Sequence, residues 1–306
     1  MAWSNSSDLV STRYIILNAS TATTNGGRPS WRRSAMRPMG NRSRAPMPWW
    51  SVSIQRPLAN DPKKRLLSPM LKTAVIIAGG EGSRLKPLSI NKPKAMVEIN
   101  GQPMLYWIAQ WLKFHGLQRV VIGVAYKKEK ILSYMRSQKN LGLEAEFSVH
   151  TLEGGTAQGF RLAISRFVED DDFIAMNCDE ITNMDLKKLA RRHEEKAPLV
   201  TMALAPFYCR FSVVQEGKNG FITGFKYGHV LQSVPVSMGV YVFNRKILPH
   251  IPETGSIENE VFAKLAPKGK IAYYRLAKEE QWISVNDVKN VREVEENKHL
   301  LQLPPG

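Results

Sequence analysis

Hydrophobic and polar residues change their spacing several times between residues 74 and 176, and the changes mark an alternation of strands and helices. Short apolar runs predict buried strands at Val75–Ala78, Arg119–Val124, Ala145–Val149 and Phe173–Met176. Apolar residues at helical spacing predict helices from Pro103 to Gly116, around Lys127–Arg136 and up to Phe167. Strands that alternate with helices over this distance predict βαβ units and a parallel sheet.

The second half of the chain is rich in predicted strands. Asp185 is the expected N-cap of a helix, and apolar runs after it predict strands at Leu199–Leu204, Phe211–Val214, Phe221–Phe225 and Val236–Phe243. A last amphipathic helix is predicted over Val288–Leu301. The two halves together predict an α/β fold in one domain, residues 70–306. We expect a three-layer, mostly parallel, doubly wound sheet that binds ligands beyond the carboxyl ends of its strands.

The first 69 residues differ from the rest in composition. They are rich in Ser, Arg, Pro and Asn, show no sustained helix or strand period, and hold eleven Lys or Arg residues against two acidic ones. We expect this leader to be disordered and to carry no chemistry. Its arginine and serine content resembles that of an organellar transit peptide. A start assigned too far upstream, with Met70 as the true start, is the explanation that we favour.

Composition and charge argue against several classes of protein. No apolar stretch reaches the roughly 18 residues that a membrane span needs. The two cysteines, Cys178 and Cys209, are too few for a disulfide framework, so a reducing, cytoplasmic setting is expected. The net charge of +16 suggests a nucleic-acid partner, but more than half of it belongs to the leader. The modest positive balance of the remainder suits phosphate-bearing substrates, and we expect no nucleic-acid or membrane partner.

A glycine-rich loop follows the first predicted strand. Three glycines let its backbone turn tightly and expose its N–H groups: Gly79, Gly80 and Gly82. Three cations follow, at Arg84, Lys92 and Lys94. A dinucleotide-binding loop would need a third glycine where Leu85 stands, and a kinase-type P-loop would need Gly-Lys-Ser/Thr. An ordinary strand-to-loop turn is the plainer alternative, but the cations favour a phosphate site.

Three consecutive motifs resemble those of the sugar-1-phosphate nucleotidyltransferase family, also called nucleotide-sugar pyrophosphorylases. The matching segments are Gly79–Leu88, Pro93–Met96 and Gly101–Met104, and weaker similarity continues to about Leu300. The resemblance implies a Rossmann-like nucleotidyltransferase fold in which the loop wraps a nucleoside triphosphate, with contacts from Ala78, Gly79, Gly80, Gly82 and Ser83. It also implies that Arg84 contacts the β- and γ-phosphates and that Lys94 contacts the α-phosphate.

The same resemblance implies a magnesium site. Asp179 follows a predicted buried strand, where it is either a turn-forming residue or a hard oxygen ligand for Mg²⁺; the family's metal-binding aspartate stands at this place. For a second ligand, many relatives have an aspartate where this chain has Ser284. The N-acetylglucosamine-1-phosphate uridylyltransferases instead use the asparagine of a Val-Asn pair, which Asn286 matches. Asp287 has a plainer role as a helix N-cap, so the choice among Asn286, Asp287 and neither stays open, and we favour Asn286.

The motifs for the base and the sugar are less well matched. Gly155 and Thr156 resemble an element that lies against the nucleotide, although Thr156 also suits a helix cap. Gly239 resembles a glycine whose backbone binds sugar hydroxyls. Glu258 is a second sugar candidate, with a solvated first-turn helix residue as the plainer reading. The lysine of the family's Glu-Lys-Pro motif is missing, and Lys226 is the nearest replacement unless it is simply an exposed strand lysine.

These features favour Mg²⁺-dependent transfer of a nucleotidyl group from an NTP to a sugar 1-phosphate, giving an NDP-sugar and pyrophosphate. Mannose- or heptose-1-phosphate guanylyltransferases and glucose-1-phosphate thymidylyltransferases are the nearest analogies. Ser284 and the missing Glu-Lys-Pro motif motivate one alternative, a catalytically inactive regulatory subunit that binds nucleotide sugars. A nucleic-acid binder driven by charge is the other. The base, the sugar and the formation of a homo-oligomer are left open by the sequence.

Overall fold

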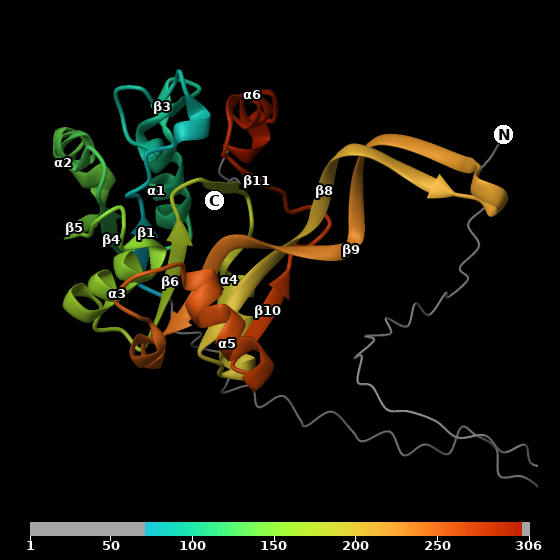
Figure 1. Ribbon diagram of the computed structural model, residues 1–306. Coiled ribbons are helices and arrows are strands. Elements are labelled where there is room, and N and C mark those ends of the chain that lie inside the picture. The colour runs from blue at the N-terminus through green and yellow to red at the C-terminus, as the bar shows by residue number, and fades with distance from the viewer. Residues whose placement is uncertain (1–70, 302–306) are drawn as a thin grey trace, which may run out of the picture. The chain divides into compact units, whose positions relative to one another are not determined.

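The computed structural model describes residues 71–301, which lie in one unit of the chain, Asn60–Gly306. The leader predicted over residues 1–69 lies outside the described residues. The central element is a seven-stranded sheet with the strand order β10-β8-β9-β6-β1-β4-β5 (Figure 1). Its strands are β1 Thr73–Ile77, β4 Arg119–Val124, β5 Glu144–Val149, β6 Asp172–Asn177, β8 Val200–Glu216, β9 Ile222–Asn244 and β10 Ile271–Arg275.

The sheet is mostly parallel in its core. Strands β5, β4, β1 and β6 run parallel to their neighbours, and β10 runs parallel to β8. Only β9 is reversed, because it pairs antiparallel with both β6 and β8. Two small antiparallel pairs complete the strands of the described region: β2 Glu98–Ile99 with β3 Gln102–Pro103, and β7 Glu180–Thr182 with β11 Trp282–Ser284. The predicted doubly wound sheet is confirmed.

Helices cover both faces of this sheet. Those packed on one face are α1 Met104–Phe114, α2 Lys128–Ser137, α4 Leu186–Lys196 and α6 Val288–Glu296. Those on the other are α3 Gly155–Phe167 and α5 Ala263–Leu265. Shorter helical turns are η2 Ser83–Leu85, η3 Lys94–Met96, η4 Lys139–Gly142, η5 Lys218–Gly220, η6 Arg245–His250, η7 Glu258–Phe262, η8 Ala266–Lys268 and η9 Lys298–Leu300.

Alternate residues of β1 enter different cores. Ala74 and Ile76 pack in the core beneath α1, whereas Val75 and Ile77 pack in the core beneath α3. Because successive side chains of a strand point to opposite faces, a strand covered on both sides must be apolar throughout. The continuous run after Lys72 therefore predicted both the strand and its two-sided burial, and the three-layer architecture is confirmed.

Four predicted strands in the second half are in fact two long ones, and that part of the prediction is wrong. Strands β8 and β9 continue past Pro206 and Pro235, which face each other in the pairing. A register shift follows directly after Pro206, and an irregular position is where a strand tolerates proline. Beyond it the two strands run on as a ribbon, past the last helix in Figure 1. We call residues Phe207–Leu231 the arm.

The last helix is also shorter than predicted. Asp287 caps its start by accepting a hydrogen bond from the N–H of Asn290 at 2.9 Å, as expected. The helix α6 ends at Glu296, because the side chain of Asn297 donates to the carbonyl of Glu293 at 2.7 Å and closes the last turn. The predicted cap at Asp185 is confirmed, since its carboxylate accepts from the N–H of Lys187 at 2.9 Å.

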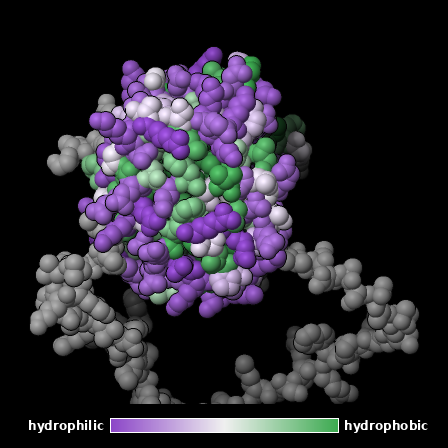
Figure 2. Space-filling view, turned by 90° about the vertical axis from the view of Figure 1, so that its left-hand side faces the viewer, coloured by the Kyte–Doolittle hydropathy of each residue, from purple (hydrophilic) through white to green (hydrophobic). Residues whose placement is uncertain are grey.

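The surface over the β5 edge of the sheet mixes both kinds of side chain. Figure 2 views the unit from this side and shows hydrophobic residues at the centre of the face, inside a rim of hydrophilic ones. Val149, at the end of β5, and Leu152, just after it, are exposed apolar residues. No helix among residues 71–301 is long and apolar enough to cross a membrane.

Candidate active site

The glycine loop connects β1 to η2, and packing explains its first glycine. A Cβ on Gly79 would lie 2.7 Å from Cε1 of the buried His150 and 2.9 Å from the Cβ of Ala125. Gly80 differs, because nothing lies within 4 Å of the position its Cβ would take. The loop therefore rests on His150 through Gly79 and is open to a ligand at Gly80.

Hydrogen bonds hold the loop by its carbonyl groups. The carbonyl of Gly79 accepts from Tyr126 N at 3.1 Å, that of Gly80 from Lys94 N at 3.1 Å, and that of Gly82 from Ser89 Oγ at 2.6 Å. Within residues 71–301, none of the N–H groups from Gly79 to Gly82 donates a hydrogen bond to backbone or side chain. A fixed loop whose amides have no protein acceptor is a candidate binding site for anions such as phosphate.

Lys94 brings the cationic and acidic parts of the site together. Its Nζ donates to Oδ1 of Asn286 at 2.7 Å and forms a short ion pair with Asp179. The side chains of Lys94 and Asp179 are each 13% exposed, so this ion pair lies at the floor of the site rather than on its surface. Arg84 Nη2 also reaches Oδ1 of Asn286, at 3.4 Å. Four of the residues chosen from the sequence are therefore gathered at one point.

Three distant segments supply this cluster. Lys94 begins η3, Asp179 follows β6, and Asn286 follows β11. The N–H of Val285 donates to the carbonyl of Asp179 at 2.8 Å, which holds the end of β11 against the end of β6. The cluster therefore lies beyond the carboxyl ends of β1 and β6, where a doubly wound sheet binds its ligands.

A second carboxylate, Glu180, is buried behind the cluster. It accepts from Trp282 Nε1 at 2.7 Å and from the hydroxyl of Ser284 at 3.3 Å. The same Ser284 oxygen accepts from Nδ2 of Asn286 at 2.7 Å. Because the amide nitrogen of Asn286 is held by Ser284, its oxygen Oδ1 is turned toward Lys94. Burial, and then the charge of Asp179, raise the pKa of Glu180 well above its usual value.

Gly239 closes the site from the side of β9. A Cβ there would lie 2.6 Å from Oε1 of Glu180 and 3.0 Å from Nδ2 of Asn177, and the backbone φ is +70°. Two residues on, the phenol of Tyr241 is buried within hydrogen-bond distance of Ser237 Oγ, at 3.3 Å. The predicted sugar-site glycine therefore lies directly against the floor of the site, and a side chain at this position would displace Glu180.

The start of α3 is tied to the loop before η7. Ala157 N donates to the carbonyl of Gly255 at 2.9 Å, and Ile257 N donates to the hydroxyl of Thr156, also at 2.9 Å. Thr156 is thus not the helix cap considered from the sequence: α3 begins at Gly155, and the Thr156 hydroxyl holds another segment. Glu258 is exposed in the first turn of η7 and accepts from Ser256 Oγ at 2.6 Å.

Two lysines chosen from the sequence are not part of the cluster. Lys92 pairs with Glu98, with Nζ 2.7 Å from Oε1, at the surface. Lys226 is exposed on the arm, where it pairs with Val213 of the neighbouring strand and not with any residue of the site. The plain reading of Lys226 as an exposed strand lysine fits this position, and the structure does not support it as a sugar-phosphate ligand within one chain.

A pocket opens beside the cluster and shares Arg84 and Asn286 with it. It is bounded by Arg84, Ser284 and Asn286 on the side of the cluster, by Trp282 of β11, and by the first arm residues Phe207 and Tyr208. Aromatic walls with a few convergent polar groups are typical of small-molecule sites. The pocket therefore suits a polar ligand that reaches the cations through one end.

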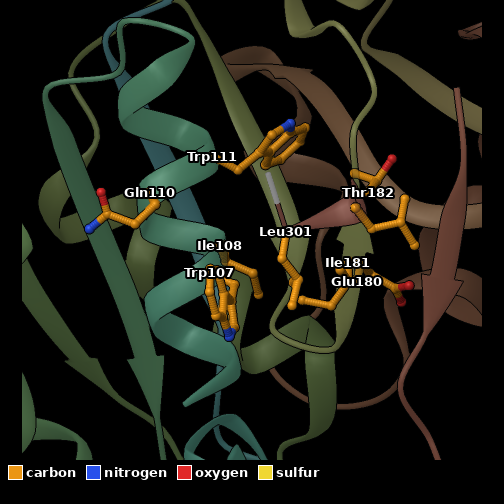
Figure 3. A pocket seen from close by; sticks show the side chains of 9 residues that line it. Trp107, Ile108, Gln110, Trp111, Glu180, Ile181, Thr182 and Leu301 are labelled. Carbon is orange, nitrogen blue, oxygen red and sulfur yellow. The ribbon is translucent and has the colours of Figure 1, made fainter. Parts of the chain in front are cut away.

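A second pocket, which Glu180 also lines, carries no predicted site residue. It is small and lies between α1 and β7, with Trp107 and Trp111 on one side, Thr182 on the other and Leu301 between them (Figure 3). Trp111 is fixed because its Nε1 donates to the carbonyl of Met184 at 3.1 Å. This packing supports β7 and so helps to hold Glu180, which lines the same pocket, in place.

The cluster has donors that could hold a hard cation. Two oxygens, one from Asp179 and one from Asn286, converge on a single positive atom, Nζ of Lys94. Mg²⁺ is usually bound by one or two carboxylates, substrate phosphates and waters. No group of three or more His, Cys, Asp or Glu side chains suited to a metal occurs among residues 71–301, so phosphate oxygens would have to complete the coordination.

Burial raises the pKa of Cys178 to about 12, which keeps its thiol protonated.

Comparison with known proteins agrees with this geometry. The family model described as "Nucleotidyl transferase" matches residues 73–299, which cover every residue of the cluster. The chain belongs to this family of nucleotidyltransferases, and the resemblance to those that act on sugar 1-phosphates is confirmed.

Two curated relatives illustrate the similarity. A mannose-1-phosphate guanylyltransferase catalytic subunit beta of Dictyostelium discoideum is 31% identical over 224 residues, which are 71% of this chain and 62% of the relative. A UTP–glucose-1-phosphate uridylyltransferase of Synechocystis is 24% identical over 234 residues, 70% of this chain and 60% of the relative. The chain thus spans about six tenths of the length of these relatives.

Two solved structures share the fold. HddC from Yersinia pseudotuberculosis, complexed with GMP-PN, matches with a TM-score of 0.59 and 22% identity, over 74% of this chain and 100% of that one. A putative glucose-1-phosphate thymidylyltransferase from Bacillus anthracis, in complex with sucrose, matches with a TM-score of 0.60 and 19% identity, over 77% and 97%. The predicted Rossmann-like fold is confirmed.

Glu180 and His150 were not found by reasoning from the sequence. Glu180 directly follows Asp179, and two adjacent carboxylates after a buried strand are a signal that could have been used. His150 supports the loop from a position 71 residues away, and a lone histidine after a predicted strand gives no such signal. Glu180 holds Ser284, which in turn holds Asn286, and His150 packs against Gly79 of the loop. Both residues therefore support the candidate site from behind.

Proposed function

We propose that this protein transfers a nucleotidyl group from a nucleoside triphosphate to a sugar 1-phosphate, with release of pyrophosphate. The observation that carries the proposal is the loop from Gly79 to Gly82, whose amides are free for phosphate within the described region and lie next to Arg84 and Lys94. An oxygen of the sugar phosphate attacks the α-phosphorus in line, so no protein nucleophile is required.

The residues of the cluster have distinct roles in this reaction. The loop amides bind the triphosphate, Arg84 stabilises the departing pyrophosphate, and Lys94 neutralises the charge that builds up at the α-phosphate. Asp179 and Asn286 would hold Mg²⁺, which when bound supplies positive charge to phosphate oxygens of both substrates. The buried position of Lys94 and Asp179 strengthens these interactions, because water screens them less.

For the substrates, we propose guanylyl transfer to mannose 1-phosphate as the first pair to test. The relative with this name is 31% identical to the chain. Uridylyl and thymidylyl transfer to glucose 1-phosphate come next, after the relative and the structural neighbour that bear those names. The pocket beside Arg84, with Phe207, Tyr208 and Trp282 in its walls, would extend the substrate site beyond the cluster.

The test is pyrophosphate release by the full chain with Mg²⁺, across GTP, UTP and dTTP and the corresponding sugar 1-phosphates. Lys94→Ala should lower turnover by roughly 10²–10³-fold, because it removes a preorganised charge. Lys92→Ala is the matched control: the same change two residues away breaks only a surface pair with Glu98. Equal turnover in the two variants would contradict the role of Lys94.

A catalytically inactive sensor remains the second candidate. It is favoured by Ser284, which stands where many relatives have a metal-binding aspartate, and by Lys226, which lies on the arm and not at the site. Under this alternative the chain would bind NTP but release no pyrophosphate with any pair of substrates. Measuring NTP affinity by calorimetry alongside turnover separates the two candidates.

A further inference from the structure

The arm exposes an unusual amount of aromatic surface. Phe211 is 80% exposed, Phe221 74%, Phe225 72% and Tyr227 76%, and Ile222 near the tip is 63% exposed. Together the four rings expose about 500 Å² of mostly apolar surface, since an aromatic side chain offers roughly 150–250 Å². Contiguous apolar patches of a few hundred Å² on a soluble protein usually mark an interaction site.

The arm has little within the described chain to stabilise it. Strand β8 pairs with β10 only up to Leu204, and β9 pairs with β6 only from Val240 onward. Between these points the two strands pair only with each other in the region described. A lone two-stranded ribbon is at best marginally stable in water, and its outer edges leave backbone groups ready for another strand.

Apolar side chains gather on one face of the ribbon. Val214 lies opposite Phe225 in the pairing, and Tyr227 follows two residues later on the same strand. Neighbours across a ribbon, and residues two apart along a strand, share a face. Val214 is itself 45% exposed, so these three side chains form an uncovered apolar face, which we call the arm face.

We propose that the arm face packs against the arm face of a second copy of this chain, forming a two-fold symmetric dimer. A standard interface takes roughly 800 Å² from each partner, and the arm face, with Val214, Phe225 and Tyr227 exposed by 45%, 72% and 76%, supplies the apolar centre of such a contact. A two-fold contact uses the same patch on both subunits. An apolar face can pack against an identical face, because it needs no complementary charge or pocket on the partner. Val214, Phe225 and Tyr227 carry no charge, so the arm face offers little to a charged partner.

The arm also connects this proposed contact to the candidate site. Its first residues, Phe207 and Tyr208, line the pocket beside Arg84. The tip residues and the pocket residues lie on the same two strands. Holding the arm in a dimer would therefore also hold one wall of that pocket.

The test is the oligomeric state of the full chain by sedimentation velocity, over about 1–100 µM protein. A dimer is expected, and the double variant Phe225→Ser/Tyr227→Ser should raise its dissociation constant by roughly 100-fold or more, since buried aromatic anchors dominate an interface. Tyr273→Ser is the matched control, because Tyr273 is 54% exposed on β10, away from the arm, and it should leave the dimer unchanged.

A second variant guards against misfolding of the substituted arm. Replacing residues 210–228 with Asn-Gly joins Cys209 to His229, which already face each other in the pairing, through a favoured hairpin turn. No arm residue belongs to either hydrophobic core, so this variant should fold and be monomeric. A dimer that persists in both variants would overturn the proposal.

A monomeric wild-type chain at all concentrations would overturn it as well. Slow hydrogen exchange of the arm amides in such a monomer would show that residues 1–70 of the same chain cover the arm face. Fast exchange would show that nothing covers it. These outcomes are independent of pyrophosphate release, so the dimer can fail while the proposed function stands.

Discussion

At the scale of single residues, the neighbouring glycines Gly79 and Gly80 have different structural roles. Gly79 has no room for a side chain, because His150 and Ala125 pack against it, whereas the space around Gly80 is open. Both were recognised from the sequence as parts of one flexible turn. The sequence could not separate their roles, because the residues that crowd Gly79 come from distant segments.

Substituting each glycine by alanine should separate stability from binding. Gly79→Ala is expected to lower the free energy of unfolding by about 1–3 kcal/mol, as overpacking in a filled core does. Gly80→Ala should leave the unfolding free energy nearly unchanged but weaken NTP binding, because its methyl group enters the space above the loop amides. Denaturant unfolding and calorimetric titration with GTP measure the two effects. GTP binding by Gly80→Ala that equals wild-type binding would contradict the proposed role of the loop.

Ser284 provides a second test at this scale. Its oxygen accepts from Nδ2 of Asn286 and its hydroxyl donates to Glu180, so it orients Asn286. Ser284→Ala should weaken divalent-ion binding by roughly 10-fold, within the range that supporting groups around a metal show. Mn²⁺ binding followed by electron paramagnetic resonance measures this without reference to activity. Unchanged Mn²⁺ affinity would mean that Asn286 needs no support or is not a ligand.

At the scale of elements, the parallel strands were easier to predict than the antiparallel ones. Strand β4 was predicted with its observed bounds, Arg119–Val124, because burial on both faces makes it apolar throughout. Strands β8 and β9 were divided into four pieces. Polar residues and two prolines interrupt their apolar pattern, and a ribbon that leaves the core has no buried face to maintain a period.

Three buried histidines lie in or beside these elements and make the fold sensitive to acid: His115 after α1, His150 after β5 and His193 in α4. Burial lowers the pKa of each, partly offset at His115 by Asp185 and at His193 by Asp172. Between the folded pKa and the unfolded value near 6.5, the unfolded chain binds more protons. The stabilising effect is therefore complete above about pH 6.5 and is lost as the pH falls below it.

Denaturant unfolding at pH 7.5 and pH 5.5 checks this prediction. The histidines should lower the free energy of unfolding at pH 5.5 by up to about 1.4 kcal/mol per pH unit each, whereas Glu180, with its raised pKa, contributes in the opposite direction. In a Glu180→Gln variant, which removes that contribution, a free energy of unfolding that is equal or higher at pH 5.5 would contradict the burial argument. The measurement needs no substrate and so does not depend on the proposed function.

At the scale of the whole molecule, the sequence predicted which residues form the site better than it predicted what supports them. Arg84, Lys94, Asp179 and Asn286 were chosen from motifs spread over about 200 positions, and the structure gathers them. Lys226 was chosen as the nearest replacement for the lysine of a missing motif, and it lies on the arm. Site residues taken from matched motifs lie together at the ends of the sheet's strands, whereas the residue chosen in place of a missing motif lies on the arm, outside the core of the sheet.

The described site residues also define how much of the chain the reaction needs. They extend from Ala78 to Asn286, within the segment 73–299 that matches the family. Removing residues 1–69 should therefore leave pyrophosphate release within about twofold of the full chain. Steady-state turnover of the two forms, at matched protein and Mg²⁺ concentrations, makes the comparison. A large loss of turnover would show that the leader contributes to the site.

The central claim is that the glycine loop and Lys94 hold a nucleoside triphosphate. The most direct measurement is a crystal structure of the protein with Mg²⁺ and a non-hydrolysable GTP analogue. We expect the triphosphate on the amides of Gly79 to Gly82, the α-phosphate within hydrogen-bond distance of Lys94 Nζ, and the metal on Asp179. A triphosphate bound elsewhere, with Lys94 still paired to Asp179 and Asn286, would contradict the account.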